Sequence, residues 1–202
     1  MKDIDDIFDI RSLAEKLFSV MNEIGKGMPS NVTPEDIKDI ALFHSKGAAA
    51  AGVASGWVPG FGGAIATATT AGFVWGMYLR INNKIGLSIS KNILKTLASG
   101  IVANLAAFAV GAIAVTTTLP FIPIVGNVGA MVIIGSVGYA ITIVSAGIYL
   151  TILTKFFQTK GGDINKMSAD DLKDLAKEVI DNNDVESALK QAKKAYEKEH
   201  KE

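Results

Sequence analysis

Charged residues are absent from two long stretches of the chain, residues 47–79 and 96–154, although they are frequent on either side of both. Each uncharged stretch contains proline near its middle, at Pro59 in the first and at Pro120 and Pro123 in the second. Because proline and neighbouring glycines break a helix, each stretch is predicted to form two apolar helices joined by a turn. The chain is therefore expected to be all-α, with two membrane-inserting apolar helical hairpins at its centre.

The segments outside the hairpins show the three- and four-residue spacing of apolar positions that is typical of amphipathic helices. Residues 3–25 predict one such helix. Thr33 and Pro34 indicate the start of another, because a hydroxyl side chain caps the first backbone amides and proline fits the first turn. Near the C-terminus, Ser168 is predicted to cap a helix that an asparagine pair ends, before a last helix rich in lysine and glutamate.

The second hairpin is long enough to cross a bilayer. Its arms, residues 96–118 and 127–154, each reach the roughly 20 apolar residues that span a hydrocarbon core. The first hairpin has only about eleven residues in its arm after Lys46, so it is expected to span less well, or to be re-entrant, interfacial or packed against the second hairpin. Lysines and Arg80 flank the hairpins, whereas neither turn carries a charge. Under the positive-inside rule, both termini are therefore expected in the cytoplasm.

The same pattern divides the chain into four segments. The mean hydropathy of +0.32 hides this division, since 49% of the residues are hydrophobic and 20% are charged. Residues 1–33 are predicted to form an amphipathic helix and linker, and residues 34–95 the first hairpin and its connector. Residues 96–158 are predicted to form the transmembrane hairpin, and residues 159–202 a soluble, charged helical tail.

Small residues recur at four-residue intervals along the apolar arms and indicate close helix packing. Such ridges let helix backbones approach where lipid removes the hydrophobic driving force between helices. Asn104 lies alone within an apolar arm, and its amide is expected to face another helix. The residues predicted to serve helix packing or oligomerisation are Ala48, Gly52, Gly56, Ala68, Gly72, Gly76 and Asn104, and those predicted to form the hairpin turns are Pro59, Gly60, Gly62, Pro120, Pro123 and Gly126.

Composition and motifs point away from catalysis. The formal net charge is +0, which does not favour a nucleic-acid partner, and the absence of cysteine excludes thiolate metal sites and cysteine nucleophiles. His44 and His200 lie in different segments without the spacing of metal ligands. The glycines around Phe61 are not followed by the lysine of a phosphate-binding loop, and no nucleophile elbow is present. The sequence therefore predicts no enzyme, no cofactor and no metal site.

Three short motifs carry a resemblance to a known family. They are the turn Val58-Pro59-Gly60-Phe61-Gly62, the helix end Tyr78-Leu79-Arg80-Ile81 followed by Gly86, and the second turn Ile122-Pro123-Ile124-Val125-Gly126. Over about residues 46–157 the chain resembles an uncharacterised bacterial family of YcjF-like, GTPase-associated membrane proteins. The resemblance implies Ala-rich helices and membrane association beside a GTPase or stress system, and it implies no mechanism. Gly63 and Ala64 depart from the family, which favours an acidic residue after the first turn.

Three function hypotheses follow from the sequence. The first is a membrane-embedded scaffold or anchor that self-associates and recruits a cytosolic protein partner. The second is a pore-forming or membrane-disrupting effector with a soluble-to-inserted transition, and the third is a lipid-binding carrier. The N-terminus is acidic where a signal peptide needs positive charge, so the expected location is the cytoplasmic (inner) membrane. A secreted effector that inserts into a target membrane is the alternative, and the expected partners are the lipid bilayer and further copies of the chain.

Overall fold

The computed structural model describes residues 9–55, 62–114, 126–161, 163 and 168–200, and these residues form helices without any strand. The predicted all-α class is confirmed. In chain order the helices are α1 Ile10–Glu23, α2 Pro34–Ser55, α3 Gly62–Ile85, α4 Lys91–Ala114, α5 Gly126–Lys160, α6 Ala169–Asn182 and α7 Val185–Glu199.

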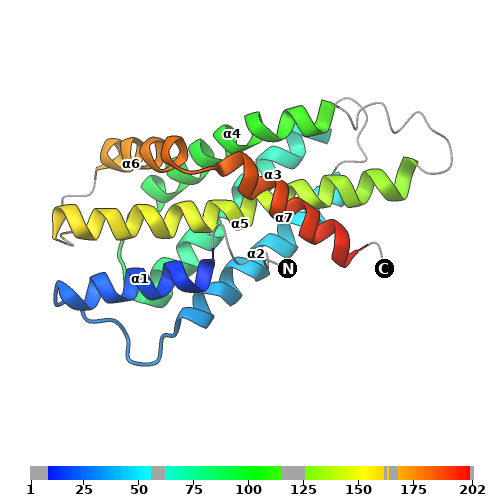
Figure 1. Cartoon of the computed structure of the whole chain (residues 1–202). Helices are drawn as coiled ribbons and strands as arrows, with labels where there is room; N and C mark the ends of the chain where they lie inside the picture. Colours follow the sequence, from blue (N-terminus) through cyan, green and yellow to red (C-terminus); the bar gives the residue numbers. More distant parts are fainter. Residues whose placement is uncertain (1–8, 56–61, 115–125, 162, 164–167, 201–202) are drawn as a thin grey trace.

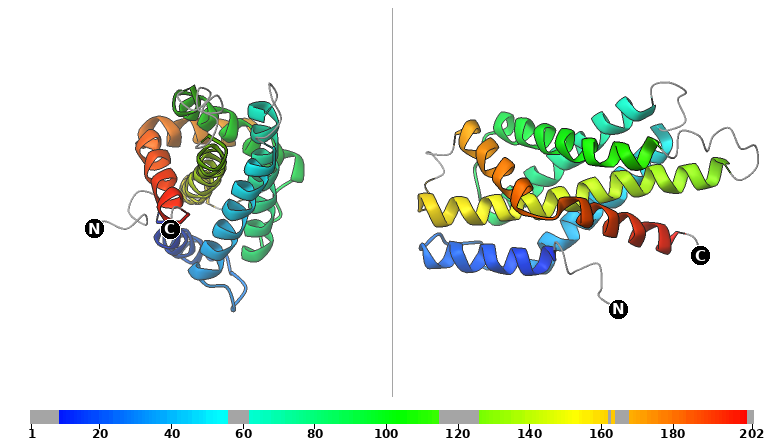
Figure 2. Two further views of the ribbon diagram at one scale, coloured as in Figure 1. Left: turned by 90° about the vertical axis from the view of Figure 1, so that its right-hand side faces the viewer. Right: turned by 45° about the horizontal axis from the view of Figure 1, so that its top comes forward.

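Helix α5 is the axis of the molecule. It packs against each of the other six described helices. The end-on view in Figure 2 shows α5 at the centre of a ring made by α1, α2, α3, α4, α6 and α7, and Figure 1 shows α5 running along the length of the bundle. One hydrophobic core cluster contains buried residues from all seven helices.

The composition of α5 explains its central position. Apolar residues are spread evenly around this helix, without a polar face, and such a helix is stable only when it is covered on all sides. Its side chains from Val144 to Leu150 are all buried. In the uncharged part of α5, the hydroxyl groups of four residues donate to backbone carbonyls one turn earlier in the same helix, at 2.6–2.9 Å, so they need no partner from a neighbouring helix: Thr142, Ser145, Thr151 and Thr154.

Local capping chemistry sets where the outer helices begin, as the sequence predicted. The Thr33 hydroxyl accepts from the backbone N–H of Asp36, whose carboxylate in turn accepts from the Thr33 N–H at 2.8 Å. Ser168 and Asp171 make the same reciprocal arrangement at the start of α6. This capping box satisfies amide groups that the first turn of a helix leaves without intrahelical partners, and it fixes the point at which each helix starts.

Of the membrane arrangement predicted from the sequence, the structure shows one candidate spanning helix, by length and composition. Within the described residues, one segment is long and apolar enough to cross a membrane, Gly135–Lys160, with a mean hydropathy of 1.7. In the bundle, 83% of that segment's apolar window is buried by protein. The four-armed, two-hairpin arrangement is therefore not confirmed.

Glycine on α5 permits the closest approach between α5 and α2. A Cβ atom added at Gly138 would lie 2.9 Å from the backbone oxygen of Ala48, and one at Gly135 would lie 3.0 Å from Val53. Gly72 on α3 is different, because an added Cβ would have no heavy atom within 4 Å. The two helices can therefore pack backbone to backbone only where α5 has no side chain.

We expect Gly138→Ala to lower the free energy of unfolding by about 1 kcal/mol, because overpacking against a backbone oxygen (about 1–3 kcal/mol) exceeds the gain in helix propensity (about 1 kcal/mol). The matched variant Gly72→Ala has open space and should raise the free energy of unfolding by up to about 1 kcal/mol. Urea unfolding followed by circular dichroism measures both. Equal effects of the two substitutions would contradict the close contact between α2 and α5.

Candidate functional site

Unsatisfied polar groups in the core draw attention to the surroundings of α3. Among the side chains that the structure describes, the buried nitrogen and oxygen atoms without a hydrogen-bond partner are both ring nitrogens of His44 and the Nδ2 atom of Asn82. His44 lies on α2 facing α3, and Asn82 lies on α3 facing α5. A buried polar atom without a partner is energetically unfavourable, so such groups are rare and often mark a functional position.

The contact between α2 and α3, here called the α2–α3 seam, is built from two reciprocal glycine contacts. Gly47 on α2 faces Phe73 on α3, where an added Cβ would come within 2.5 Å of the ring. Gly76 on α3 faces His44 on α2, where an added Cβ would lie 3.2 Å from the imidazole Cε1. Each ring therefore occupies the space that a glycine leaves open on the opposite helix. The His44 ring also packs at steep angles against the rings of Phe43 and Phe73, at 5.3 and 6.3 Å between centroids.

This environment favours the uncharged form of His44. The residue is only 8% exposed. Burial lowers its pKa below the ordinary value of 6.5, and the positive charge of Arg80 lowers the pKa further, while the backbone of Phe73 acts in the opposite direction. An imidazolium at this position would lie in an aromatic setting near another cation.

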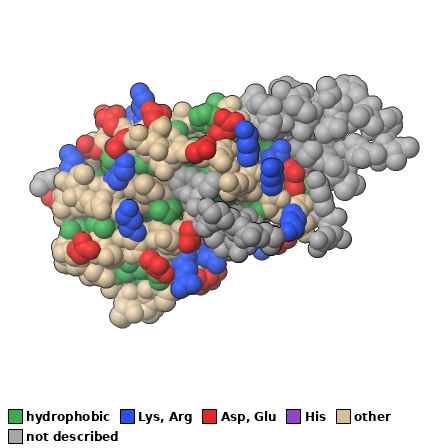
Figure 3. All heavy atoms as spheres, viewed as in Figure 1, with side chains coloured by type: hydrophobic (Ala, Val, Ile, Leu, Met, Phe, Trp, Pro, Cys, Tyr) green, Lys and Arg blue, Asp and Glu red, His purple; other side chains and the backbone are tan. Residues whose placement is uncertain are grey.

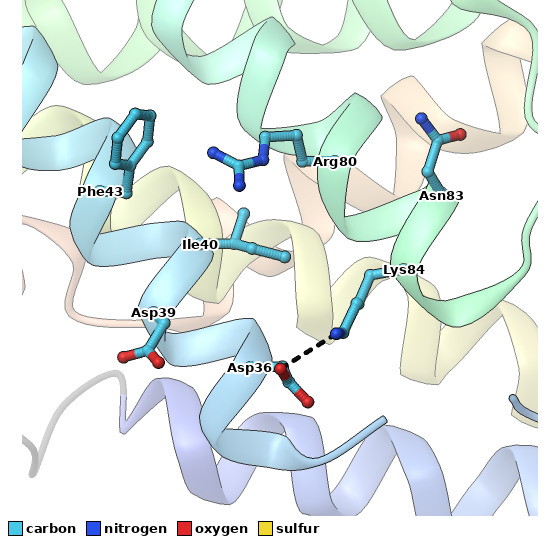
Figure 4. A pocket seen from close by; sticks show the side chains of 7 residues that line it. All are labelled: Asp36, Asp39, Ile40, Phe43, Arg80, Asn83 and Lys84. Atoms are coloured by element: carbon cyan, nitrogen blue, oxygen red, sulfur yellow. Dashed lines mark ion pairs between the residues drawn. The ribbon is translucent and has the colours of Figure 1, made fainter. Parts of the chain in front are cut away.

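A shallow groove with mixed charge runs along the outer side of the seam (Figure 4). It is lined by Asp36, Asp39, Ile40, Phe43, Arg80, Asn83 and Lys84. Lys84 forms an ion pair with Asp36 at 3.0 Å, and the guanidinium of Arg80 lies 4.9 Å from the centre of the exposed Phe43 ring. Hydrogen bonds from the Thr33 backbone and from Lys84 lower the pKa of Asp36 below 3.8. The two cations and two carboxylates balance, so the groove does not favour a ligand of either charge.

Between α3 and α5 the core holds a pair of stacked tyrosines. The rings of Tyr78 and Tyr149 lie 4.0 Å apart and nearly parallel, and both side chains are fully buried. The Tyr78 hydroxyl donates to the Ser145 carbonyl at 3.0 Å, and the Tyr149 hydroxyl donates to Oδ1 of Asn82 at 2.7 Å. These directional bonds fix the register of α3 on α5, a register that apolar contacts alone leave less defined.

The C-terminal helices cover α5 with their apolar faces and turn charge outward. Tyr196 of α7 packs on Tyr139 of α5 at 5.2 Å between ring centroids, and the Ser136 hydroxyl donates to the Glu197 carboxylate at 3.2 Å. Figure 3 shows acidic and basic side chains distributed over the face on which α6 and α7 lie. α7 thus brings charge alongside the part of α5 that has none of its own.

The structure separates the small residues that the sequence grouped together. Ala48 and Gly52 are buried, whereas Ala68 and Gly72 are exposed, and Gly76 faces His44. Asn104 is also exposed, and its Nδ2 donates to the Gly100 carbonyl of its own helix at 2.8 Å. Within the described chain this amide bonds to its own helix, and its predicted contact with another helix in an oligomer stays a prediction.

The predicted turn residues are described only in part. Gly62 and Gly126 are the first residues of α3 and α5. The others, together with Gly56 of the packing set, lie outside the described residues: Pro59, Gly60, Pro120 and Pro123.

Sequence reasoning missed the residues at which helices meet most closely. Gly47, Gly135 and Gly138 are not in the predicted packing set, yet each would collide with a neighbouring helix if it carried a side chain. The sequence led us to consider His44 as a metal ligand and as a residue unfavourable inside lipid, but not as a contact between helices. The available signal was a histidine at the border of an uncharged stretch, three residues before Gly47.

Comparison with known proteins adds no assignment, because no family model, no curated protein and no solved structure matches the chain.

We expect Tyr149→Phe to lower the free energy of unfolding by about 1–3 kcal/mol, because the change leaves the buried Asn82 amide without its remaining hydrogen bond. The double variant Tyr149→Phe with Asn82→Leu removes both polar partners and should recover most of that loss. Urea unfolding measures both variants. A double variant less stable than Tyr149→Phe alone would contradict this account of the buried pair.

Proposed function

We propose that this chain is a membrane-inserting protein whose closed bundle shields the apolar helix α5 until the protein meets a bilayer. The proposal rests on two properties that α5 combines, namely the character of a membrane span and nearly complete burial by protein. Its Gly135–Lys160 segment has the length and hydropathy of a membrane span, and 83% of its apolar window is covered by the surrounding helices. A helix that is apolar on all sides can be covered by protein or by lipid, and here protein supplies the cover.

The distribution of charge along the bundle supports this proposal. The uncharged parts of α2, α3, α4 and α5 lie toward the same end of the molecule, on the right in Figure 1. Lys84, Lys91, Lys155 and Lys160 lie in the other halves of α3, α4 and α5. α7 carries charge alongside this part of α5, so the uncharged end becomes suited to a hydrocarbon environment once α7 has moved away, while the other end suits water.

The arrangement of α6 and α7 favours a transition over permanent insertion. Their buried residues Leu172, Val179, Val185 and Leu189 pack into the common core. With these apolar faces occupied, the helices do not present them to a cytosolic partner as a recruiting scaffold would. In an inserted state, α7 would leave the uncharged part of α5 and expose its surface to lipid, while α6 stays at the charged end of α5. The resemblance to YcjF-like membrane proteins fits membrane association and remains a prediction.

The lipid-carrier hypothesis has less support from the described residues. The groove found there is lined by two carboxylates and two cations, and it lies outside the core. Hydrocarbon chains would require an apolar lining.

A cleavable tether between α5 and α7 tests the transition. The natural chain has no cysteine, so Ser136→Cys with Glu197→Cys creates a single reactive pair where the two native side chains meet at 3.2 Å. Closing this pair with a short disulfide-containing bis-maleimide should reduce binding to liposomes at least tenfold in a flotation assay, because α7 can no longer leave α5. Cleavage of the linker with reductant should restore binding.

The control is a tether at the charged end of α5. Lys155→Cys with Glu178→Cys replaces an ion pair of 2.7 Å between α5 and α6, beyond the uncharged stretch. This tether should leave liposome binding close to that of the untethered protein. Equal binding by the protein tethered at residues 136 and 197 would overturn the proposed transition. Release of a trapped dye in the same samples separates a membrane-disrupting effector, which empties the liposomes, from an anchor, which does not.

A further inference from the structure

We propose that His44 is an acid sensor: its protonation opens the α2–α3 seam and thereby loosens the cover over α5. Opening of the seam on protonation is a property of the folded protein alone. Loosening of the cover over α5 rests on the membrane insertion proposed above.

The packing around His44 makes protonation of the ring unfavourable. The imidazole is sealed between α2 and α3 by Phe73 and by the close approach of Gly76, and neither ring nitrogen makes a hydrogen bond of good geometry. The backbone of Phe73 favours the protonated ring, but burial and the charge of Arg80 outweigh it. Burial away from water disfavours the charged imidazolium relative to the neutral ring. When the ring gains a proton, both nitrogens become donors, and the seam offers no carboxylate to receive them.

The charges around the seam work in the same direction. On α3, Arg80 is the charged group that acts on His44, and Lys84 further along is paired with Asp36. On α2 itself, Asp39 and Lys46 are exposed and lie off the His44 face, where the helical neighbours are Ile40, Ala41, Gly47 and Ala48.

The other two helices that pack on α2 add no opposite charge near His44. Between Gly126 and Thr154, α5 has no charged residue, and its titratable side chains there are the phenols of Tyr139 and Tyr149. α1 brings Arg11 near Glu35 at the start of α2, more than two turns from His44.

The direction of the pH effect follows from linkage. The pKa of His44 is lowered in the folded protein, so the unfolded or opened chain binds the proton more tightly than the closed bundle does. Closed-state stability is therefore complete above the unfolded value of about 6.5 and declines as the pH falls below it. The pKa values of Asp36 and Asp171 are lowered below 3.8, so these two carboxylates stay ionised between pH 5.0 and 7.5.

The experiment uses the fact that the chain has only two histidines, His44 and His200. His200 is exposed and stacks on Tyr196 at the end of α7, which makes His200→Gln a matched control. His44→Leu and His44→Gln both remove the titrating ring, and their agreement separates the loss of the proton from any misfit of one side chain. Urea unfolding is measured for all four proteins at pH 7.5 and 5.0, together with flotation on phosphatidylcholine liposomes.

In the natural protein and in His200→Gln, the unfolding equilibrium constant should rise by up to about tenfold per pH unit below 6.5, the limit for one proton. In both His44 variants this rise should disappear. The fraction bound to liposomes should increase on acidification wherever His44 is present, and should become independent of pH where it is absent.

Different results would overturn the pH sensor and its connection to membrane insertion. The same acid sensitivity with and without His44 would overturn the sensor. Acid sensitivity that depends on His44 but brings no increase in liposome binding would support the sensor and overturn its connection to insertion.

Discussion

The structure depends on one constraint: a helix that is apolar around its whole circumference must be covered on every side. α5 is that helix, and each of the other described helices packs against it. The amphipathic α1, α6 and α7 turn one face toward it and leave the other to water. Together with α2, α3 and α4 they keep an apolar segment of membrane-span length out of solvent, an arrangement that is favourable because burial of apolar area is the main stabilising term in folding.

Glycine sets the distances in this arrangement. Where α2 crosses α5, Gly138 brings the two backbones together, and where α2 meets α3, Gly47 and Gly76 each leave space for a ring from the opposite helix. Closely packed interiors do not deform continuously, so such contacts tend to be either made or lost together. α2 belongs to both contacts, and its position therefore connects the α2–α3 seam to the cover over α5.

Local chemistry made part of the fold predictable from the sequence. Thr33, Pro34 and Ser168 mark helix starts through hydrogen bonds that span three residues, and the apolar character of α5 is visible in its composition. Contacts between distant residues were not predictable in the same way. In an Ala- and Gly-rich chain, a four-residue spacing does not reveal which stripe faces inward, and Ala48 and Gly72 have opposite exposure. Asn104 satisfies its amide on its own helix, and the importance of His44 depends on Gly76, 32 residues away on another helix.

The hydroxyl groups along α5 have a consequence for the movement of this helix between environments. Thr142, Ser145, Thr151 and Thr154 each bond to a carbonyl of the same helix, so these hydrogen bonds travel with α5 and do not depend on its surroundings. If lipid replaced the surrounding helices, these hydrogen bonds within α5 would stay intact. Side-chain bonds that tie α5 to its neighbours, such as those of Ser136 with Glu197 and Tyr149 with Asn82, are by contrast specific to the closed bundle. The hydroxyl groups at these four positions of α5 therefore keep their hydrogen bonds whether water, protein or lipid surrounds the helix.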